Sequence, residues 1–153
     1  MFVENIFEYI KKQLENGIKP ALYIKTASIK ARKGIIGEKI VTIMSDGHIE
    51  SQNIVKNDGD MVVTNPNGEQ FLMRAKDFAE RYMPIPEKPE HYYPKPLPQT
   101  MLYLDKDIEF VAPWGEVMSI RAGGYLNITK LDEGYVYGIQ PREFKQTYKP
   151  YNK

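Results

Sequence analysis

The chain has 153 residues, and its 21 Lys and Arg against 20 Asp and Glu leave a net charge of +1. This length fits one mid-sized domain or two small ones, and nucleic-acid binding is not indicated because the chain lacks the basic excess that phosphate recognition requires. The absence of cysteine excludes disulfides, thiolate nucleophiles and cysteine-ligated metal sites.

The N-terminus predicts one amphipathic helix. Ile6, Ile10 and Leu14 recur at the spacing of one helix face, Gly17 suits the left-handed end of a helix, and Pro20 prevents its continuation. Charged residues stand where a signal peptide would be apolar, and no apolar run reaches the roughly 20 residues that cross a bilayer. We therefore expect a cytoplasmic protein without a membrane partner, in a bacterial cell or a phage-infected host.

Residues 21–84 predict a first β module. Apolar and polar residues alternate in several short runs, which is typical of strands with one buried face. The turn Asn65-Pro66-Asn67-Gly68 predicts a hairpin, and residues 34–38 predict a loop. A short helix over 75–82 is expected to close the module.

Residues 85–98 predict a proline-rich linker. Six prolines fall within residues 84–98. Because proline donates no backbone hydrogen bond and holds the preceding residue extended, we expect neither a helix nor a central strand here. Binding by a proline-recognising domain is the alternative role for this segment.

Residues 99–153 predict a second β module that repeats the first, since residues 68–84 align with 134–150 without a gap. The identical pairs are Gly68 with Gly134, Phe78 with Phe144, Tyr82 with Tyr148 and Pro84 with Pro150. The predicted fold class is therefore α+β: two tandem small antiparallel β modules, each ending in a short helix, plus an N-terminal helix. The predicted divisions are residues 1–20 (helix), 21–84 (first module), 85–98 (linker) and 99–153 (second module).

The repeated pattern of glycine turn, short strand, hairpin, alternating strand and F-x-x-x-Y helix resembles the PGDYG-type proteins of phages, prophages and bacteria. The motif of that family corresponds to residues 58–62 and 122–126. Both copies lack its leading proline, its Asp is kept only as Asp60, and its Tyr only as Tyr125. The family has no established function, so the resemblance implies the fold and a phage-linked origin but no activity.

No catalytic motif is apparent. The two histidines, His48 and His91, have no second histidine at metal-ligand spacing, and no phosphate-binding glycine motif occurs. We therefore predict no catalytic residue, no metal and no cofactor. Carboxylates such as Asp77 and Glu143 would have to converge in one pocket to perform acid–base chemistry.

Tyrosine is abundant, and aromatic residues with polar groups suit either sheet packing or recognition of a partner. The predicted contact residues are Trp114, Tyr125, Tyr135, Tyr137, Asp60, Lys76 and Arg142. The leading hypothesis is a non-catalytic binding or accessory protein, related to phages or mobile elements, that engages a protein partner. A binder of a small ligand such as a nucleotide signal is the second hypothesis, and a carboxylate-based enzyme is the third. Homo-oligomerisation is left open.

Overall fold

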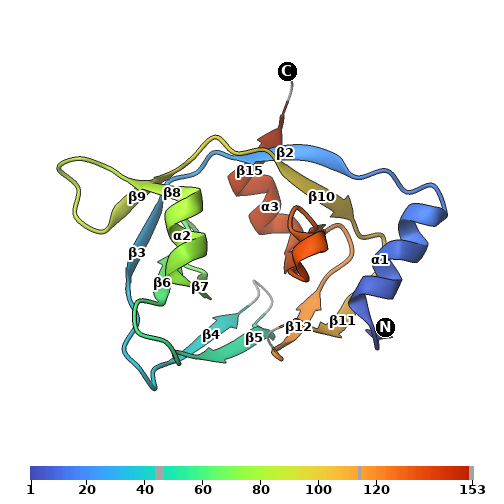
Figure 1. The fold of residues 1–153 in the computed structure, drawn as a ribbon, viewed down its shortest axis with the longest axis horizontal. Helices are drawn as coiled ribbons and strands as arrows, with labels where there is room; N and C mark the ends of the chain where they lie inside the picture. The colour runs from blue at the N-terminus through green and yellow to red at the C-terminus, as the bar shows by residue number, and fades with distance from the viewer. Residues whose placement is uncertain (44–46, 114, 152–153) are drawn as a thin grey trace. The chain divides into compact units, whose positions relative to one another are not determined.

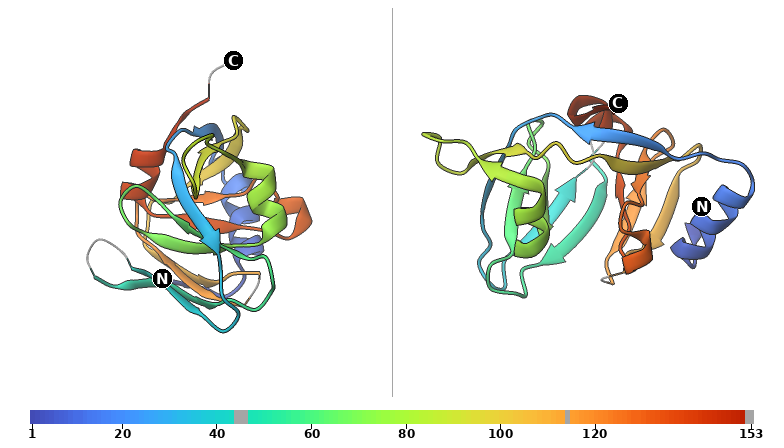
Figure 2. Two further views of the ribbon diagram at one scale, coloured as in Figure 1. Left: turned by 90° about the vertical axis from the view of Figure 1, so that its left-hand side faces the viewer. Right: turned by 45° about the horizontal axis from the view of Figure 1, so that its top comes forward.

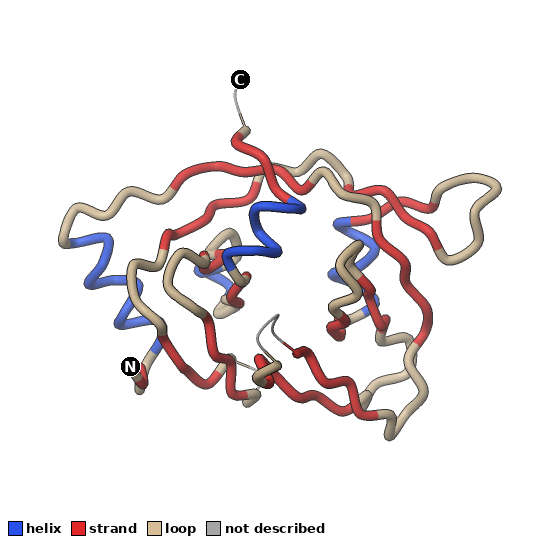
Figure 3. The backbone as a smooth tube through the Cα atoms, turned by 180° about the vertical axis from the view of Figure 1, so that it is seen from behind, coloured by secondary structure: helices blue, strands red, loops and turns tan. Residues whose placement is uncertain are grey.

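The computed structural model describes residues 1–43, 47–113 and 115–151. Over these residues it contains three α-helices and fifteen strands, which confirms a β-rich α+β fold with an N-terminal helix (Figures 1 and 3). The chain divides into two compact units. Unit 1 contains residues 1–24 and 98–153, and unit 2 contains residues 25–97.

Helix α1 (Ile6–Glu15) confirms the predicted N-terminal helix. The side chain of Asn5 caps it by accepting hydrogen bonds from two backbone N–H groups of the first turn. Ile6 and Ile10 are buried on one face, as their spacing predicted. Gly17 follows the helix with a φ of 89°, a left-handed conformation that glycine adopts without strain.

Unit 1 contains a five-stranded sheet with the order β14-β13-β10-β2-β15 and a three-stranded sheet with the order β1-β11-β12. The strands are β1 (Phe2–Val3), β2 (Ala21–Lys25), β10 (Gln99–Tyr103), β11 (Ile108–Val111), β12 (Val117–Ile120), β13 (Tyr125–Asn127), β14 (Tyr137–Ile139) and β15 (Tyr148–Pro150). A short 3-10 helix, η1 (Leu131–Glu133), precedes β14, and α3 (Pro141–Thr147) joins β14 to β15.

The two faces of the five-stranded sheet of unit 1 pack against different elements. Leu102 joins Ile10 and Phe110 in the larger core, which includes one face of α1. Met101, the neighbouring residue on β10, points to the opposite face and packs with Phe144 of α3. The sheet is therefore covered by apolar contacts on both sides.

Unit 2 contains a five-stranded sheet with the order β7-β6-β3-β9-β8 and a separate hairpin, β4-β5. The strands are β3 (Ile29–Lys33), β4 (Lys39–Ile43), β5 (Ile49–Ile54), β6 (Met61–Thr64), β7 (Gln70–Met73), β8 (Tyr82–Pro84) and β9 (His91–Pro94). Helix α2 (Ala75–Arg81) joins β7 to β8 and buries Phe78 in a core that includes Ile29 and Val63. The predicted hairpin at residues 65–68 is present between β6 and β7.

The prediction that residues 85–98 exclude a central strand is wrong, because β9 lies between β3 and β8. The prolines of this segment flank β9 or stand at its last position, so the N–H groups of residues 91–93 remain available for pairing. The carbonyl of Glu90 accepts from Ala31 N (2.8 Å), and that of His91 accepts from Ile85 N (2.9 Å). The extended backbone that proline imposes on its neighbours is compatible with a strand.

The two five-stranded sheets differ from the predicted tandem arrangement in one strand each. Strand β2 precedes β3 in the sequence but pairs with β10 in unit 1, where Tyr23 lies opposite Gln99. Strand β9 precedes β10 in the sequence but pairs with β3 in unit 2, where Tyr92 lies opposite Ile29. Figure 1 shows both pairings. The units therefore do not coincide with residues 21–84 and 99–153.

Candidate interaction surface

Tyr125, Tyr135 and Tyr137, which were predicted to contact a partner, lie in unit 1. Tyr125 belongs to an aromatic cluster on the sheet face that α3 covers. The ring of Tyr125 stacks on Phe144 with centroids 3.8 Å apart, and Tyr23 meets Phe144 edge-on at 4.8 Å. Burial, together with the hydrogen bond that the Tyr125 hydroxyl donates to Tyr23, raises the pKa of Tyr125 to about 12. Tyr103, at 5.4 Å from Tyr125, is the exposed end of the cluster. These contacts give Tyr125 a packing role.

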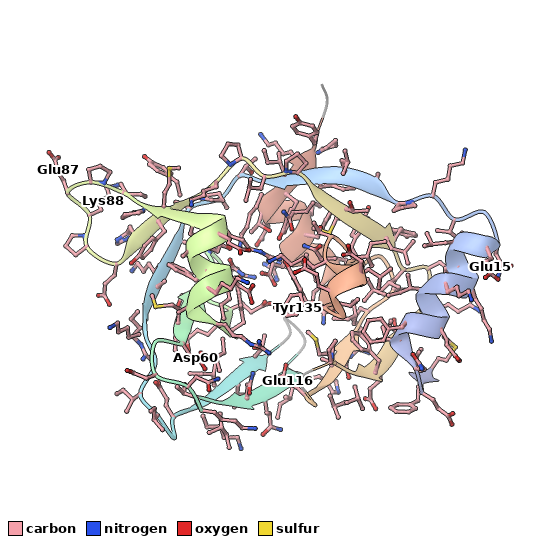
Figure 4. The ribbon with its side chains drawn as sticks, viewed as in Figure 1. Glu15, Asp60, Glu87, Lys88, Glu116 and Tyr135 are labelled. Carbon is pink, nitrogen blue, oxygen red and sulfur yellow. The ribbon has the colours of Figure 1, made fainter. Side chains whose placement is uncertain are left out.

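Tyr137 takes part in a buried polar network in unit 1. Its hydroxyl accepts a hydrogen bond from Asn127 Nδ2 (2.8 Å), which also donates to Gln99 Oε1 (3.0 Å). Asn127 Oδ1 accepts from both the backbone N–H and the hydroxyl of Thr129. The network therefore satisfies the buried amide and links β10 to β13 and β14. Tyr135 lies just after η1, with its ring 5.8 Å from that of Tyr137 (Figure 4).

The predicted polar contact residues are divided between the two units. Asp60, in unit 2, is buried and closes a turn, since its Oδ2 accepts from Asn57 N (3.4 Å) and its carbonyl accepts from Gly34 N (2.7 Å). Lys76 is exposed in the first turn of α2, and Arg142 is exposed in the first turn of α3. Trp114 lies outside the described residues.

A different group of residues in unit 2 forms an exposed apolar surface. We call it the isoleucine surface, and it comprises Ile35 (71% exposed), Ile36 (63%), Ile43 (54%), Ile49 (49%) and Ile54 (48%). All five lie on the hairpin β4-β5 or on the loop that leads into it. A concentration of exposed apolar side chains on one short segment is a feature of interaction sites. The isoleucine surface is therefore the candidate functional site.

The loop that carries Ile35 and Ile36 is held in place by one carboxylate. Glu38 Oε1 accepts from Ile35 N (3.1 Å), while both carboxylate oxygens pair with the guanidinium of Arg32. Gly37 adopts a φ of 92° and donates its N–H to the carbonyl of Val55 (2.8 Å), which ties the loop to the residue that follows β5. These contacts hold the two isoleucine side chains in an exposed position.

The outer face of the hairpin supplies the other three isoleucines. Residues opposite each other in an antiparallel ladder share a face, and Ile43 lies opposite Ile49 while Ile54 lies opposite Lys39. The inner face holds Ile40 and Thr42, which are buried, and Thr42 Oγ1 donates to the carbonyl of Gln70 on β7 (2.5 Å). Because the inner face is anchored on the unit 2 sheet, the outer face remains exposed.

Lysines border the isoleucine surface. Lys33 ends β3, Lys39 begins β4, and Lys56 follows β5 closely; all three are exposed. Within the described part of the chain, none of the three forms an ion pair. The isoleucine surface thus combines exposed apolar side chains with exposed lysines, one of which, Lys39, lies directly opposite Ile54.

The hairpin β11-β12 occupies the corresponding place in the chain order of unit 1 and has a different outer face. Glu109 and Ser119 lie opposite each other there and share a hydrogen bond (3.0 Å). Strand β1 pairs in parallel with β11 along its edge. Among the described residues of the hairpin β11-β12, the exposed large apolar ones are Val111 and Val117, and the loop leading into β11 contains Asp105, Lys106 and Asp107. This hairpin provides a matched control position.

The pKa of Glu38 offers a test of the loop geometry. Its pKa falls from 4.5 to about 2 because Arg32 and the N–H of Ile35 stabilise the carboxylate. The pKa of Glu38 is lower in the folded state than in the unfolded state, so the ionised carboxylate stabilises the fold above about pH 4.5. This stabilisation is lost as the pH falls toward 2. We expect a carboxyl-carbon NMR titration of Glu38 to show a midpoint near 2, and Arg32→Gln to raise it toward 4.5. An unchanged midpoint in Arg32→Gln would show that the ion pair does not hold the loop.

In comparisons with family models, curated proteins and solved structures, the chain matches none of them. The resemblance to PGDYG-type proteins stays a prediction. Over the described residues, no helix is both long enough and apolar enough to span a membrane, and no group of three or more His, Asp and Glu side chains is arranged to hold a metal ion.

Proposed function

We propose that this protein is a non-catalytic accessory protein that binds another protein through the isoleucine surface. The observation that carries the proposal is the exposure of five isoleucines on one anchored hairpin and its entry loop. A preformed apolar surface loses little conformational entropy on binding, which favours its use as an anchor. A phage or mobile-element origin and a cytoplasmic location belong to the same proposal.

The chemistry of the surface defines the partner. The isoleucines favour an apolar strip on the partner, and the exposed Lys33, Lys39 and Lys56 favour carboxylates beside that strip. The apolar contacts then supply affinity, while the charged contacts steer association. The partner is therefore a protein with an apolar patch bordered by Asp and Glu.

The first experiment identifies the partner by position-specific cross-linking. A photoreactive phenylalanine analogue replaces Ile36 in one sample and Lys106, in the corresponding loop of unit 1, in the other. We expect a protein from the host extract to cross-link at position 36 and not at position 106. Equal cross-linking at both positions would contradict a role for the isoleucine surface.

The second experiment measures affinity with the purified partner by calorimetry. Ile36→Asp places a charge among the apolar groups and is expected to weaken binding about 10-fold or more, as at interface hot spots. Val117→Asp is the matched control in unit 1 and should leave the affinity unchanged. The thermal midpoint of Ile36→Asp should match that of the wild type, since the side chain is 63% exposed. Unchanged affinity in Ile36→Asp, or occupation of the surface by a second copy or by anionic vesicles, would overturn the proposal.

A further inference from the structure

The pairing of β2 and β9 leads to an inference that is independent of the isoleucine surface. We propose that the chain is a covalently joined, strand-exchanged dimer, in which two copies of one module each give their first strand to the sheet of the other. The first half is residues 1–87 and the second half is residues 88–153. The interaction between the halves is then the one that two copies of the module would form.

The first support is topology. The unit 2 sheet has the order β7-β6-β3-β9-β8, and the unit 1 sheet has the order β14-β13-β10-β2-β15. Superimposing the two orders pairs β7 with β14, β6 with β13, β3 with β10 and β8 with β15, and these strands follow one another in the same sequence order in both units. At the remaining position the superposition pairs β9 with β2. Strand β9 is the first strand of the second half, and β2 is the first strand of the repeated part of the first half, which β1 and α1 precede. The strand missing from one sheet is thus present in the other.

Backbone hydrogen bonds recur at matching positions of the two units. Gly34 N donates to the carbonyl of Asp60 (2.7 Å) in unit 2, and Leu104 N donates to that of Gly124 (2.9 Å) in unit 1. The exchanged strands show the same correspondence. Ile85 N donates to the carbonyl of His91 on β9 (2.9 Å), and Tyr151 N donates to that of Leu22 on β2 (3.0 Å).

Each exchanged strand also supplies one ring to a matching aromatic triad. In unit 2, Phe78 stacks on Tyr82 at 5.1 Å and meets Tyr92 of β9 edge-on at 4.8 Å. In unit 1, Phe144 stacks on Tyr148 at 5.1 Å and meets Tyr23 of β2 edge-on at 4.8 Å. The two triads therefore have the same centroid distances and the same stacked and edge-on contacts. In each triad the third ring, Tyr92 or Tyr23, comes from the other half of the chain.

The connections after the exchanged strands are short, and the one after β9 contains prolines. Residues 26–28 join β2 to β3, and residues 95–98 join β9 to β10. Pro96 and Pro98 lie in the second connection and hold the residues before them extended. A short hinge that resists folding back as a hairpin favours exchange over local pairing. The proline-rich segment thus directs β9 into the other sheet.

The halves share further contacts in unit 1. Strand β1 pairs with β11, and Ile6 and Ile10 of α1 are buried with Phe110. These apolar contacts add to the pairing of β2 with β10. Together they are expected to hold the halves together without a peptide bond between them.

A cleavable chain tests this expectation. A protease recognition sequence is inserted between Glu87 and Lys88, in the exposed loop that projects from β8 and β9 (Figures 2 and 4). After complete cleavage, the two fragments should co-elute at the mass of the intact chain and separate only in denaturant. A control insertion between Asn67 and Gly68 cuts within the first half. Separation of the fragments cut at residue 87 under native conditions would overturn the proposal.

Hydrogen exchange tests the direction of the exchange in the intact chain. Tyr23→Ala, in the first half, should lower protection of α3 and β14 in unit 1 and leave α2 unchanged. Tyr92→Ala, in the second half, should lower protection of α2 and β7 and leave α3 unchanged. Loss of protection mainly at α2 in Tyr23→Ala, or mainly at α3 in Tyr92→Ala, would show that each strand stabilises its own half and would contradict the exchange.

Discussion

Phe144→Ala is expected to lower the free energy of unfolding by about 3–5 kcal/mol, the usual cost of removing a buried phenyl ring. Phe144 is 7% exposed and contacts three tyrosines, with ring centroids 3.8 Å away for Tyr125, 4.8 Å for Tyr23 and 5.1 Å for Tyr148. The substitution removes these ring contacts and leaves a cavity between α3 and the sheet. Urea denaturation followed by near-ultraviolet circular dichroism measures the change.

Phe2→Ala is the control for Phe144→Ala, because the Phe2 side chain is 55% exposed. A surface substitution of this kind is expected to change the stability by about 0.5 kcal/mol or less. A loss below about 1 kcal/mol in Phe144→Ala would show that the aromatic cluster does not contribute to the core of unit 1.

Gly138→Ala is expected to destabilise unit 1 by about 1–3 kcal/mol or more, because the new methyl group has no space. A Cβ at this position of β14 would overlap Cγ1 and Cδ1 of Ile120 on β12. The backbone of Gly138 does not have a positive φ, so the effect reports the close approach of β12 and not backbone strain. Thermal unfolding of the variant measures the loss.

A double-mutant cycle with Ile120→Ala isolates the clash. With the larger side chain removed, the added methyl group would lie 3.6 Å from the remaining Cβ of residue 120, an ordinary contact. Ile120 is buried, so Ile120→Ala alone is expected to cost about 2–5 kcal/mol. The double variant should be more stable than the sum of the single effects by about 0.5–3 kcal/mol. Strict additivity would show that Ile120 is not the group that excludes a side chain from position 138.

Local signals were sufficient to predict most elements. The spacing of Ile6, Ile10 and Leu14 predicted α1, the turn at residues 65–68 predicted a hairpin, and a short helix was expected at the end of each module. The predicted helix over 75–82 is observed as α2 (Ala75–Arg81). These elements depend on contacts between residues close in sequence, which periodicity and turn chemistry encode directly.

The partners of the strands were not predictable in the same way. The strand-forming residues of a segment such as Ala21–Lys25 indicate a strand but carry no information on which sheet accepts it. In His91–Pro94, the neighbouring prolines concealed the strand itself. Both failures concern pairing between residues far apart in sequence, where tertiary packing decides the outcome.

The candidate surface was missed because isoleucine occurs on both faces of one hairpin. Ile40 is buried on the inner face while Ile43 and Ile54 are exposed on the outer face, so the pattern does not identify the buried side. The available signal was the pair Ile35-Ile36 in a predicted loop, where polar residues are usual. The abundance of tyrosine directed attention to unit 1, where Tyr125 and Phe144 pack together.

The strand exchange also sets an order for folding during synthesis. Unit 2 ends at Leu97 and can fold once that residue has left the ribosome. Strand β2 is made early, yet its neighbours β10 and β15 follow about 75 and 125 residues later. An unpaired strand edge is prone to associate with other chains. Shielding of residues 21–25 on the ribosome, by a chaperone or by fast elongation, is therefore expected to determine the yield of native protein.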